Sequence, residues 1–299
     1  MTMIACIANQ KGGTSKTSTT LALGAACAER GQRVLLVDLD PQASLTAAAG
    51  APLLGRPTVY TALSHYLAHD EAPDLAAGGM LHPVSAGLTL LPSSIDLAAA
   101  EMELVTAVRR EYILSEVLAP ALDDYDLVLI DCPPSLGLLV VNALTAAREV
   151  IVPVVPEYLA AHGLQLLLGS IGRIRKNKLN PRLQIAGIIF TMVDNRTTHG
   201  RAVAEEIRGS IGRQAPILGE VKRSIKVAEA AAAGVPITAY AARSDSALAY
   251  GQIADGLLAR WGLRPPPPAP VASGVAGAAD ADALAAATAA ATAGAVAHG

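Results

Sequence analysis

An eight-residue stretch, Gln10–Thr17, contains the residue types that bind a phosphate group. Two consecutive glycines, Gly12 and Gly13, let the backbone approach a phosphate closely. Lys16 can reach the terminal phosphates of a nucleotide, and the Thr17 hydroxyl can hold Mg²⁺. The stretch therefore predicts a site for a nucleotide and its magnesium ion.

The residues on either side of this stretch predict the elements that would position it. An apolar run at residues 4–8 predicts a buried strand, and the alanine-rich residues 18–29 predict a helix. A tight turn between them points backbone N–H groups outward, and the helix dipole favours an anion there. The strict pattern G-x-x-x-x-G-K-[ST] is incomplete, because Gln10 and Ser15 stand where it has glycine. The flanking strand and helix favour nucleotide binding over an ordinary glycine-lysine loop.

Acidic residues follow two further predicted strands. Residues 33–41 form a near-continuous apolar run with Asp38 and Asp40 at its carboxyl end, and residues 126–134 form another with Asp131 at its end. Ligands of open α/β sheets bind at the carboxyl ends of the strands. A carboxylate there, beside a phosphate loop, can organise a magnesium ion for phosphoryl transfer. We therefore expect these carboxylates to work with the phosphate loop.

Apolar runs alternate with helical stretches along the rest of the chain, which predicts an α/β fold. We expect a mostly parallel sheet flanked by helices on both faces. Further strands are expected at residues 88–92, 149–156, 184–190 and 217–221, a loop at 191–197, and helices at 58–67, 94–109, 112–122, 136–147, 163–176, 201–211, from 227, and at 246–261.

The composition predicts one large domain followed by a tail. The 299 residues are 52% hydrophobic, with one Trp and one Phe, which is enough to bury a full core. From residue 265 the sequence changes to prolines and then to 16 alanines among the last 35 residues, without Lys or Arg. We expect a folded domain at residues 1–264 and a disordered Pro/Ala-rich tail at residues 265–299.

Several features predict a cytoplasmic protein. No apolar run reaches the roughly 18 residues needed to span a bilayer, and the start of the chain has no charged segment typical of a signal peptide. Cys6, Cys27 and Cys132 stand singly in apolar contexts, which fits buried thiols in a reducing compartment. We therefore expect neither disulfides nor a membrane segment.

The net charge of −3 conceals an uneven distribution of charge. Residues 1–172 hold 8 Lys/Arg against 17 Asp/Glu, whereas residues 173–226 hold 12 against 4. A charge run usually forms a solvated helix face, but the same residues could form a surface for a polyanion. Charge alone does not decide between these two interpretations.

Four segments resemble the motifs of the ParA/MinD ATPases. Lys11–Thr17 resembles their deviant Walker A box, which begins with a second, signature lysine. Residues 37–42 are similar to the switch I box of the ParA/Soj partition proteins, residues 130–135 resemble their Walker B box, and residues 227–230 resemble a later segment. The resemblance covers about residues 3–262, with the boxes in the expected order. It implies a P-loop NTPase of the deviant Walker A class that uses ATP and Mg²⁺.

The resemblance also implies a role for each residue of the site. Lys16 would neutralise the β- and γ-phosphates, Asp40 would position the attacking water, and Asp131 would hold Mg²⁺ through water. Lys11 would reach across an ATP-dependent homodimer to the partner's nucleotide, and Asp38 would be a helper. These roles suffice, because phosphoryl transfer depends mostly on positioning and charge neutralisation. The expected set comprises Lys11, Lys16 and Asp40 for catalysis, Lys11, Gly12, Gly13, Thr14, Ser15, Lys16, Thr17 and Ser18 for the nucleotide, and Thr17, Asp40 and Asp131 for the metal.

The resemblance favours the polyanion interpretation of the basic residues. ATP dimers of such proteins bind double-stranded DNA non-specifically through the C-terminal third of the chain. With one Trp and one Phe, base stacking is not the expected mode, and contacts to the DNA backbone are. The candidates are Arg196, Arg201, Arg208, Lys222, Arg223 and Lys226, with Lys226 and Arg223 first.

The implied function is ATP-dependent segregation of chromosome or plasmid DNA at the nucleoid, with weak hydrolysis that partner and DNA stimulate. The phosphate loop begins at residue 10, which leaves no room before it for a helix-turn-helix. This favours a short, Soj-like protein that acts through a separate ParB-type centromere-binding protein.

Four alternatives were weighed against this function. A MinD-like positioning ATPase would need a basic amphipathic helix at its C-terminus, and the tail has no basic residue. A nitrogenase-type iron protein would need cysteines that share a cluster, but Cys132 belongs to the Walker B box. A biosynthetic amidoligase would need an additional substrate-binding region. An ATP-binding scaffold with little turnover is not excluded by the sequence.

Overall fold

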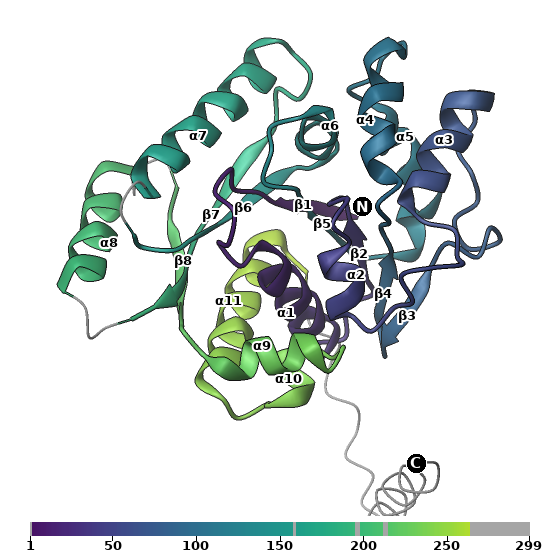
Figure 1. Cartoon of the computed structure of the whole chain (residues 1–299). Coiled ribbons are helices and arrows are strands. Elements are labelled where there is room, and N and C mark those ends of the chain that lie inside the picture. The colour runs from purple at the N-terminus through teal and green to yellow at the C-terminus, as the bar shows by residue number, and fades with distance from the viewer. Residues whose placement is uncertain (1, 158–159, 195–197, 212–214, 264–299) are drawn as a thin grey trace, which may run out of the picture. The chain divides into compact units, whose positions relative to one another are not determined.

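One eight-stranded sheet organises the part of the chain that the structure describes (Figure 1). This computed structural model describes residues 2–157, 160–194, 198–211 and 215–263. The strands lie in the order β3-β4-β2-β5-β1-β6-β7-β8, and neighbouring strands are parallel except for β3 and β4. Their bounds are β1 Met3–Ile7, β2 Val34–Asp38, β3 His82–Ser85, β4 Leu88–Leu91, β5 Leu127–Asp131, β6 Glu149–Val154, β7 Gln184–Val193 and β8 Ile217–Lys222.

Helices pack on both faces of the sheet, and a core of buried side chains lies on each face. One face carries α1 (Lys16–Ala28), α2 (Ser44–Ala48), α9 (Ile225–Ala232), α10 (Ile237–Tyr240) and α11 (Asp245–Trp261). The other carries α3 (Val59–His69), α4 (Leu97–Thr106), α5 (Ile113–Leu118), α6 (Leu138–Ala146), α7 (Ala160–Lys176) and α8 (Thr198–Ile211).

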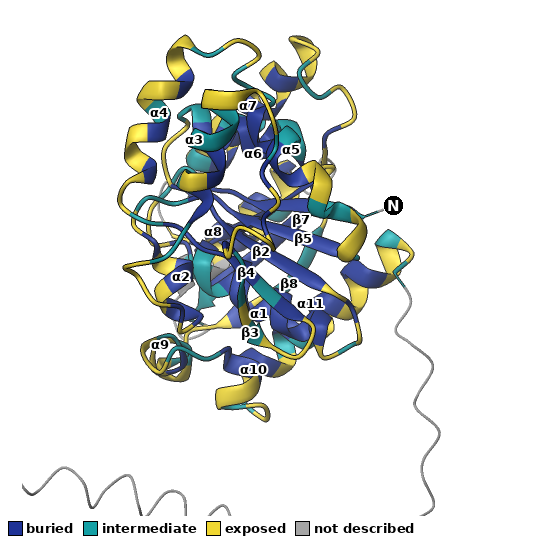
Figure 2. Ribbon diagram, turned by 90° about the vertical axis from the view of Figure 1, so that its right-hand side faces the viewer, coloured by how far each residue is buried: buried dark blue, intermediate teal, exposed yellow. Residues whose placement is uncertain are grey.

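The central strands are near-continuous apolar runs because both of their faces are covered. Every residue of β2, β5 and β6 is buried, and Figure 2 shows the strands as a dark blue layer between helices with yellow outer surfaces. This is the pattern expected of parallel strands in an α/β protein. The predicted mostly parallel sheet with helices on both faces is therefore confirmed.

The structure differs from the sequence-based elements where the sequence signal is short. Strand β3 alternates in exposure, contains Pro83 and lies antiparallel at the sheet edge, so it has no apolar run to predict it. Helices α2 and α10 have five and four residues, too few for a helical period. The helix predicted at residues 112–122 ends at Leu118 and continues as a 3₁₀ helix, because Pro120 has no N–H for the α-helical ladder. The predicted tail at residues 265–299 lies outside the described residues.

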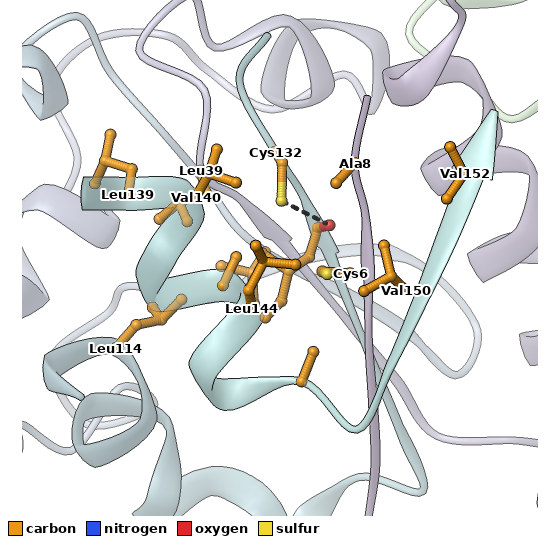
Figure 3. Close-up of a cluster of buried hydrophobic side chains, with 14 of the residues drawn as sticks. Cys6, Ala8, Leu39, Leu114, Cys132, Leu139, Val140, Leu144, Val150 and Val152 are labelled. Atoms are coloured by element: carbon orange, nitrogen blue, oxygen red, sulfur yellow. Dashed lines mark hydrogen bonds between the residues drawn. The ribbon is translucent and has the colours of Figure 1, made fainter. Parts of the chain in front are cut away.

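The three cysteines are free and buried, as the sequence predicts. The Cys132 thiol lies among Leu39, Leu139 and Val140, and it donates a weak hydrogen bond to the Ile130 carbonyl oxygen at 3.9 Å (Figure 3). The Cys132 thiol therefore packs as a small apolar group next to the end of β5.

Candidate functional site

The sheet topology brings the three predicted segments of the site to one edge. Strands β2, β5 and β1 are neighbours in that order. Their registers place Asp38 opposite Asp131, and Asp131 opposite Ile7, the last residue of β1. The loop from residue 8 to residue 15 follows directly and leads into α1. The phosphate loop and both acidic strand ends therefore meet at the carboxyl edge of the sheet, as predicted.

The phosphate loop needs left-handed backbone at two positions. Gly13 has φ of 72°, which costs glycine nothing. Ser15, immediately before α1, has φ of 62° and ψ of 32°. A residue with a Cβ is strained in this region by about 1–2 kcal/mol. The backbone at position 15 thus explains why the family motif usually has glycine there, and it shows that serine adopts the same loop.

Two residues that the sequence analysis missed hold the phosphate loop in place. The Asn9 amide donates to the Pro153 carbonyl oxygen at 2.7 Å, and its Oδ1 accepts from the Lys11 backbone N–H at 3.0 Å. The Thr191 hydroxyl donates to the Thr14 carbonyl oxygen at 3.1 Å. The ends of β6 and β7 thereby fix the loop. No local pattern reveals these bonds, because their partners lie more than 100 residues away.

The start of α1 places a hydroxyl on the Walker B carboxylate. Thr17 Oγ1 donates to Asp131 Oδ2 at 2.8 Å, and Thr20 Oγ1 lies 3.2 Å from Asp131 Oδ1. Asp131 is 1% exposed. Burial, reinforced by the negative charge of Asp38, raises the pKa of Asp131 to about 8. Asp131 therefore lies in a setting that leaves its negative charge poorly compensated.

Lys16 is buried beneath the loop, with 7% of its surface exposed. Burial lowers its pKa, while the charges of Asp131 and Asp40 act in the opposite direction. The structure therefore brings Lys16, Asp131 and Asp40 together, as the sequence analysis expects.

The two carboxylates at the end of β2 have different surroundings. Asp38 is fully buried, and its Oδ2 accepts from the Thr46 N–H at 2.8 Å and hydroxyl at 2.7 Å. Its Oδ1 accepts from the Asp40 N–H at 3.2 Å. Burial raises the pKa of Asp38 to about 6. Asp40 is partly exposed, and its Oδ1 accepts from the Gln42 N–H at 3.0 Å. Asp38 therefore fixes the backbone segment that carries Asp40. Such positioning is one way in which Asp38 could act as a helper.

The signature lysine is paired within its own chain. Lys11 Nζ lies 3.1 Å from Glu157 Oε2, and the two side chains are 37% and 53% exposed. Glu157 Oε1 is also 4.0 Å from Arg223 Nη2. Glu157 follows β6, and the sequence gives no indication that it pairs with Lys11. It connects the phosphate loop to the end of β8.

A cavity of about 260 Å³ adjoins the phosphate loop and suits a nucleotide base. Its apolar wall comes from β8, α9 and α11, and its polar groups come from the phosphate loop, α1, β7 and the residues at and after the end of β8. The lining includes Ser15, Ser18, Thr191, Met192, Ser224 and Val227. A second cavity, of about 570 Å³, lies beside Glu157, Asp194 and Arg223. Asp194, directly after β7, therefore borders this second cavity.

The candidate DNA-binding residues do not form one free basic surface. Arg208 pairs with Glu205 and Glu220 and lies over the Phe190 ring, and Lys222 pairs with Asp245 at 3.0 Å. These two cations are partly neutralised by their own chain. Arg196 and the side chain of Arg201 lie outside what the structure describes.

Two candidates fit the prediction better. Lys226 is exposed on α9 and has no ion pair with a described residue. The Arg223 side chain is 63% exposed and lies 4.0 Å from the Glu157 carboxylate. Their positions follow β8 on the carboxyl edge of the sheet.

Fold and site together define a P-loop nucleotide-binding protein of the α/β class. The model of a family described as "AAA domain" matches residues 1–185. The chain is 40% identical to the chromosome-partitioning ATPase Soj of Treponema pallidum, covering 86% of this chain and 97% of Soj. It is 39% identical to the chromosome partitioning protein ParA of Caulobacter vibrioides, covering 86% and 94%. The chain belongs to the ParA/MinD superfamily of ATPases and is similar to its Soj/ParA members.

A solved structure from Mycobacterium smegmatis is similar over the same length. It bears the name cobyrinic acid a,c-diamide synthase and contains an ATP analogue and magnesium. The TM-score is 0.75 at 39% identity, covering 88% of this chain and 96% of that chain. MinD of Pyrococcus horikoshii, at 24% identity and a TM-score of 0.69, shares the fold. Among the described helices, none combines the length and apolar character needed to cross a membrane.

Proposed function

We propose that this chain is an ATPase that dimerises around ATP, binds DNA without reading its sequence, and segregates chromosome or plasmid copies at the nucleoid with a ParB-type partner. The arrangement at Asp131 carries the proposal. A buried carboxylate accepts the hydroxyl of Thr17 in the first turn of α1, beside the buried Lys16. The relatives named as chromosome-partitioning proteins support the biological part of the proposal.

A magnesium ion fits the oxygen donors of this site. The Thr17 hydroxyl and the Asp131 carboxylate are 2.8 Å apart, and the carboxylate has no cation within hydrogen-bond distance among the described residues. No group of three or more His, Cys, Asp or Glu that could hold a metal occurs in the described part of the chain. Magnesium accepts such a sparse set, because phosphate oxygens and waters complete its coordination. Bound there with ATP, it would neutralise charge on the phosphates.

The protein's own groups would then position the reactants. The loop before α1 presents backbone N–H groups to the phosphates, and Lys16 supplies a buried positive charge beside them. Asp40 is partly exposed at the end of β2, where a carboxylate can orient a water molecule. Desolvation of Lys16 strengthens its interaction with a polyphosphate, since charges attract more strongly away from water.

Dimerisation and DNA binding would use residues on the exterior. Lys11 is partly exposed, and its ammonium group pairs with Glu157 and no other described residue, so it can exchange that carboxylate for a partner's phosphate. Lys226 and Arg223 are exposed near the nucleotide site and are the leading candidates for phosphate contacts with DNA. Because they follow β8 directly, a change at the nucleotide can reach them through a short segment.

A second candidate function follows from the name of the Mycobacterium smegmatis structure. An amide synthase was expected to need a region beyond the nucleotide domain, yet the shared fold covers 96% of that chain. Fold and length therefore do not separate the two functions. The discriminating property is what stimulates ATP consumption: DNA and a ParB-type protein in one case, or cobyrinic acid with a nitrogen donor for the amides in the other.

The proposal is tested by measuring ATP hydrolysis and DNA binding with the same preparations. We expect ATP, but not ADP, to increase binding to a random-sequence duplex, and DNA with a ParB-type protein to stimulate hydrolysis. Asp40→Ala should abolish the stimulated rate while ATP binding remains. Stimulation by cobyrinic acid with a nitrogen donor such as ammonia, and not by DNA, would establish the second function. Unchanged turnover in Asp40→Ala, without stimulation by any of these, would indicate an ATP-binding scaffold.

A further inference from the structure

Five cationic side chains gather at the C-terminal end of α7 and in the turn that follows. Residues 173–182 contain five Lys or Arg and no Asp or Glu. All five are exposed, and none forms an ion pair with a carboxylate in the described ranges of the chain. This cluster, termed the α7 basic surface, consists of Arg173, Arg175, Lys176, Lys178 and Arg182.

The turn that carries these residues is firmly attached to the fold. The Asn180 amide donates to three carbonyl oxygens at and after the end of α6, at distances of 2.6–3.1 Å. Arg175 Nε donates to the Leu183 carbonyl oxygen at 2.7 Å, and Arg173 Nη2 donates to Ser170 Oγ at 2.9 Å. The cations therefore extend from a fixed platform, which reduces the entropy lost when they bind an anion.

Helix stabilisation does not account for the whole cluster. Cations in the last turn of a helix interact favourably with its dipole, which explains Arg173, Arg175 and Lys176. Lys178 and Arg182 lie beyond the helix, and Lys178 has φ of 59°, where glycine or asparagine is usual. Five like charges repel one another, and no described carboxylate forms an ion pair with them, although Glu111 borders the same cavity as Arg173. The charge of the cluster is therefore suited to binding a polyanion from outside the chain.

The α7 basic surface lies near the amino ends of the strands, whereas the nucleotide site lies at their carboxyl ends. It adjoins the start of β7 at Gln184, whereas Lys226 follows the carboxyl end of β8. A strand of ten residues, such as β7, spans about 30 Å. Figures 1 and 2 both show α7 and α9 on opposite sides of the fold. A nucleotide in the phosphate loop would therefore lie at the other end of the strands from this surface.

We propose that the α7 basic surface binds the phosphate backbone of duplex DNA without requiring nucleotide. This inference goes beyond the proposed function, which places DNA binding near Lys226 and makes it depend on ATP. Duplex DNA is the partner that fits, because residues 173–182 carry no exposed large apolar side chain that could insert into a lipid surface. Lysine and arginine without neighbouring aromatics suit backbone contacts rather than base stacking.

The test compares two double variants that remove the same charge. Lys176→Gln with Lys178→Gln alters the α7 basic surface, and Arg109→Gln with Arg243→Gln removes two exposed cations elsewhere. Binding of a labelled 30-base-pair duplex is followed by fluorescence anisotropy without nucleotide, across a salt series. We expect the first variant to lower the slope of log affinity against log salt by about two and to weaken binding about tenfold at low salt. The second should match the wild type, and both should keep its melting temperature.

Adding ATP separates this inference from the proposed function. We expect ATP to raise the affinity of the wild type and of the Lys176/Lys178 variant by the same factor. Absence of that gain, with nucleotide-free binding still sensitive to Lys176 and Lys178, would overturn the proposed function alone. Equal nucleotide-free binding by both double variants would overturn the inference. Loss of binding to anionic phospholipid vesicles, with unchanged DNA binding, would also overturn it.

Discussion

At the scale of single residues, the most consequential group is Asp131. Its carboxylate is buried at the end of β5 and receives hydroxyls rather than cations. The charge of such a carboxylate stabilises a bound cation but destabilises the folded protein when the site is empty. The empty site should therefore carry a stability penalty that depends on pH.

We expect the metal-free and nucleotide-free protein to lose stability as pH rises from about 6 to 8. The pKa of Asp131 is about 8 in the folded protein, against an ordinary value of 3.8. The folded state therefore binds the extra proton throughout this window, and the free energy of unfolding falls as pH increases. The pKa of Asp38 is about 6, so Asp38 contributes to the pH dependence of stability mainly below this window. Asp131→Asn should remove this slope and raise stability at pH 8 by on the order of 2 kcal/mol.

Urea unfolding in EDTA at several pH values measures this effect. Asp126 provides the control, because a hydrogen bond and ion pair with Arg33 lower its pKa. Asp126→Asn should leave the slope between pH 6 and 8 in place. An unchanged slope in Asp131→Asn would show that other groups cause it.

At the scale of elements, the connection from β2 to α2 carries Asp40 and is held by a buried hydrogen-bond chain. Thr46 Oγ1 donates to Asp38 Oδ2 at 2.7 Å and accepts from the Ser93 N–H at 2.9 Å. The hydroxyl thus links β2 to the segment after β4. This link predicts that an uncharged residue outside the phosphate loop controls hydrolysis.

Thr46→Val should destabilise the protein by about 2 kcal/mol, because it leaves buried polar groups without their partner. It should also lower the stimulated ATPase rate severalfold with little change in ATP affinity, since Asp40 loses its fixed position while Lys16 does not. Steady-state kinetics and nucleotide titration measure the two effects. Thr145→Val, which removes a partly buried hydroxyl on α6, is the matched control. Equal kinetics in both variants would contradict this role of Thr46.

Element by element, the sequence predicts what is local and misses what folding brings together. Strands β1, β2 and β5, which lead to the phosphate loop and to the two acidic strand ends, are apolar runs, so the sequence pattern predicts them. Ser15 shows the limit, because a sequence pattern reports a missing glycine but not the backbone angle that the position requires. Asn9 and Glu157 act through partners about 145 residues away. Nothing near them in sequence indicates those partners.

At the scale of the whole molecule, the number of basic residues overstates the free positive charge, because some of them pair with carboxylates of the same chain. The basic excess in residues 173–226 is real, yet Arg208 and Lys222 face carboxylates that the fold brings beside them. Among the side chains that the structure describes in this window, the cations without an ion pair are Lys226, near the carboxyl ends of the strands, and the α7 basic surface, near their amino ends. Only the sheet topology reveals this division.

Glu157 leads to a prediction about assembly. It pairs with Lys11 in the single chain, so a dimer in which Lys11 meets the partner's phosphates must first break that pair. We expect Glu157→Gln to increase ATP-dependent dimerisation by about twofold to fivefold, the scale of an exposed ion pair. Sedimentation velocity with ATP measures it, and Glu116→Gln, which breaks the exposed pair with Arg109, is the control. A weaker dimer in Glu157→Gln would mean that this carboxylate supports the interface.

The position of β1 has a consequence for how the molecule is made. β1 is the first strand of the chain, but its neighbours in the sheet, β5 and β6, begin at residues 127 and 149. During synthesis its apolar edges therefore wait for more than a hundred residues before they can pair. Unpaired strand edges are prone to aggregate, and long-range parallel pairing is slow. The phosphate-loop segment thus leaves the ribosome before the strands beside which it folds, and a chaperone that shields it has the interval between them in which to act.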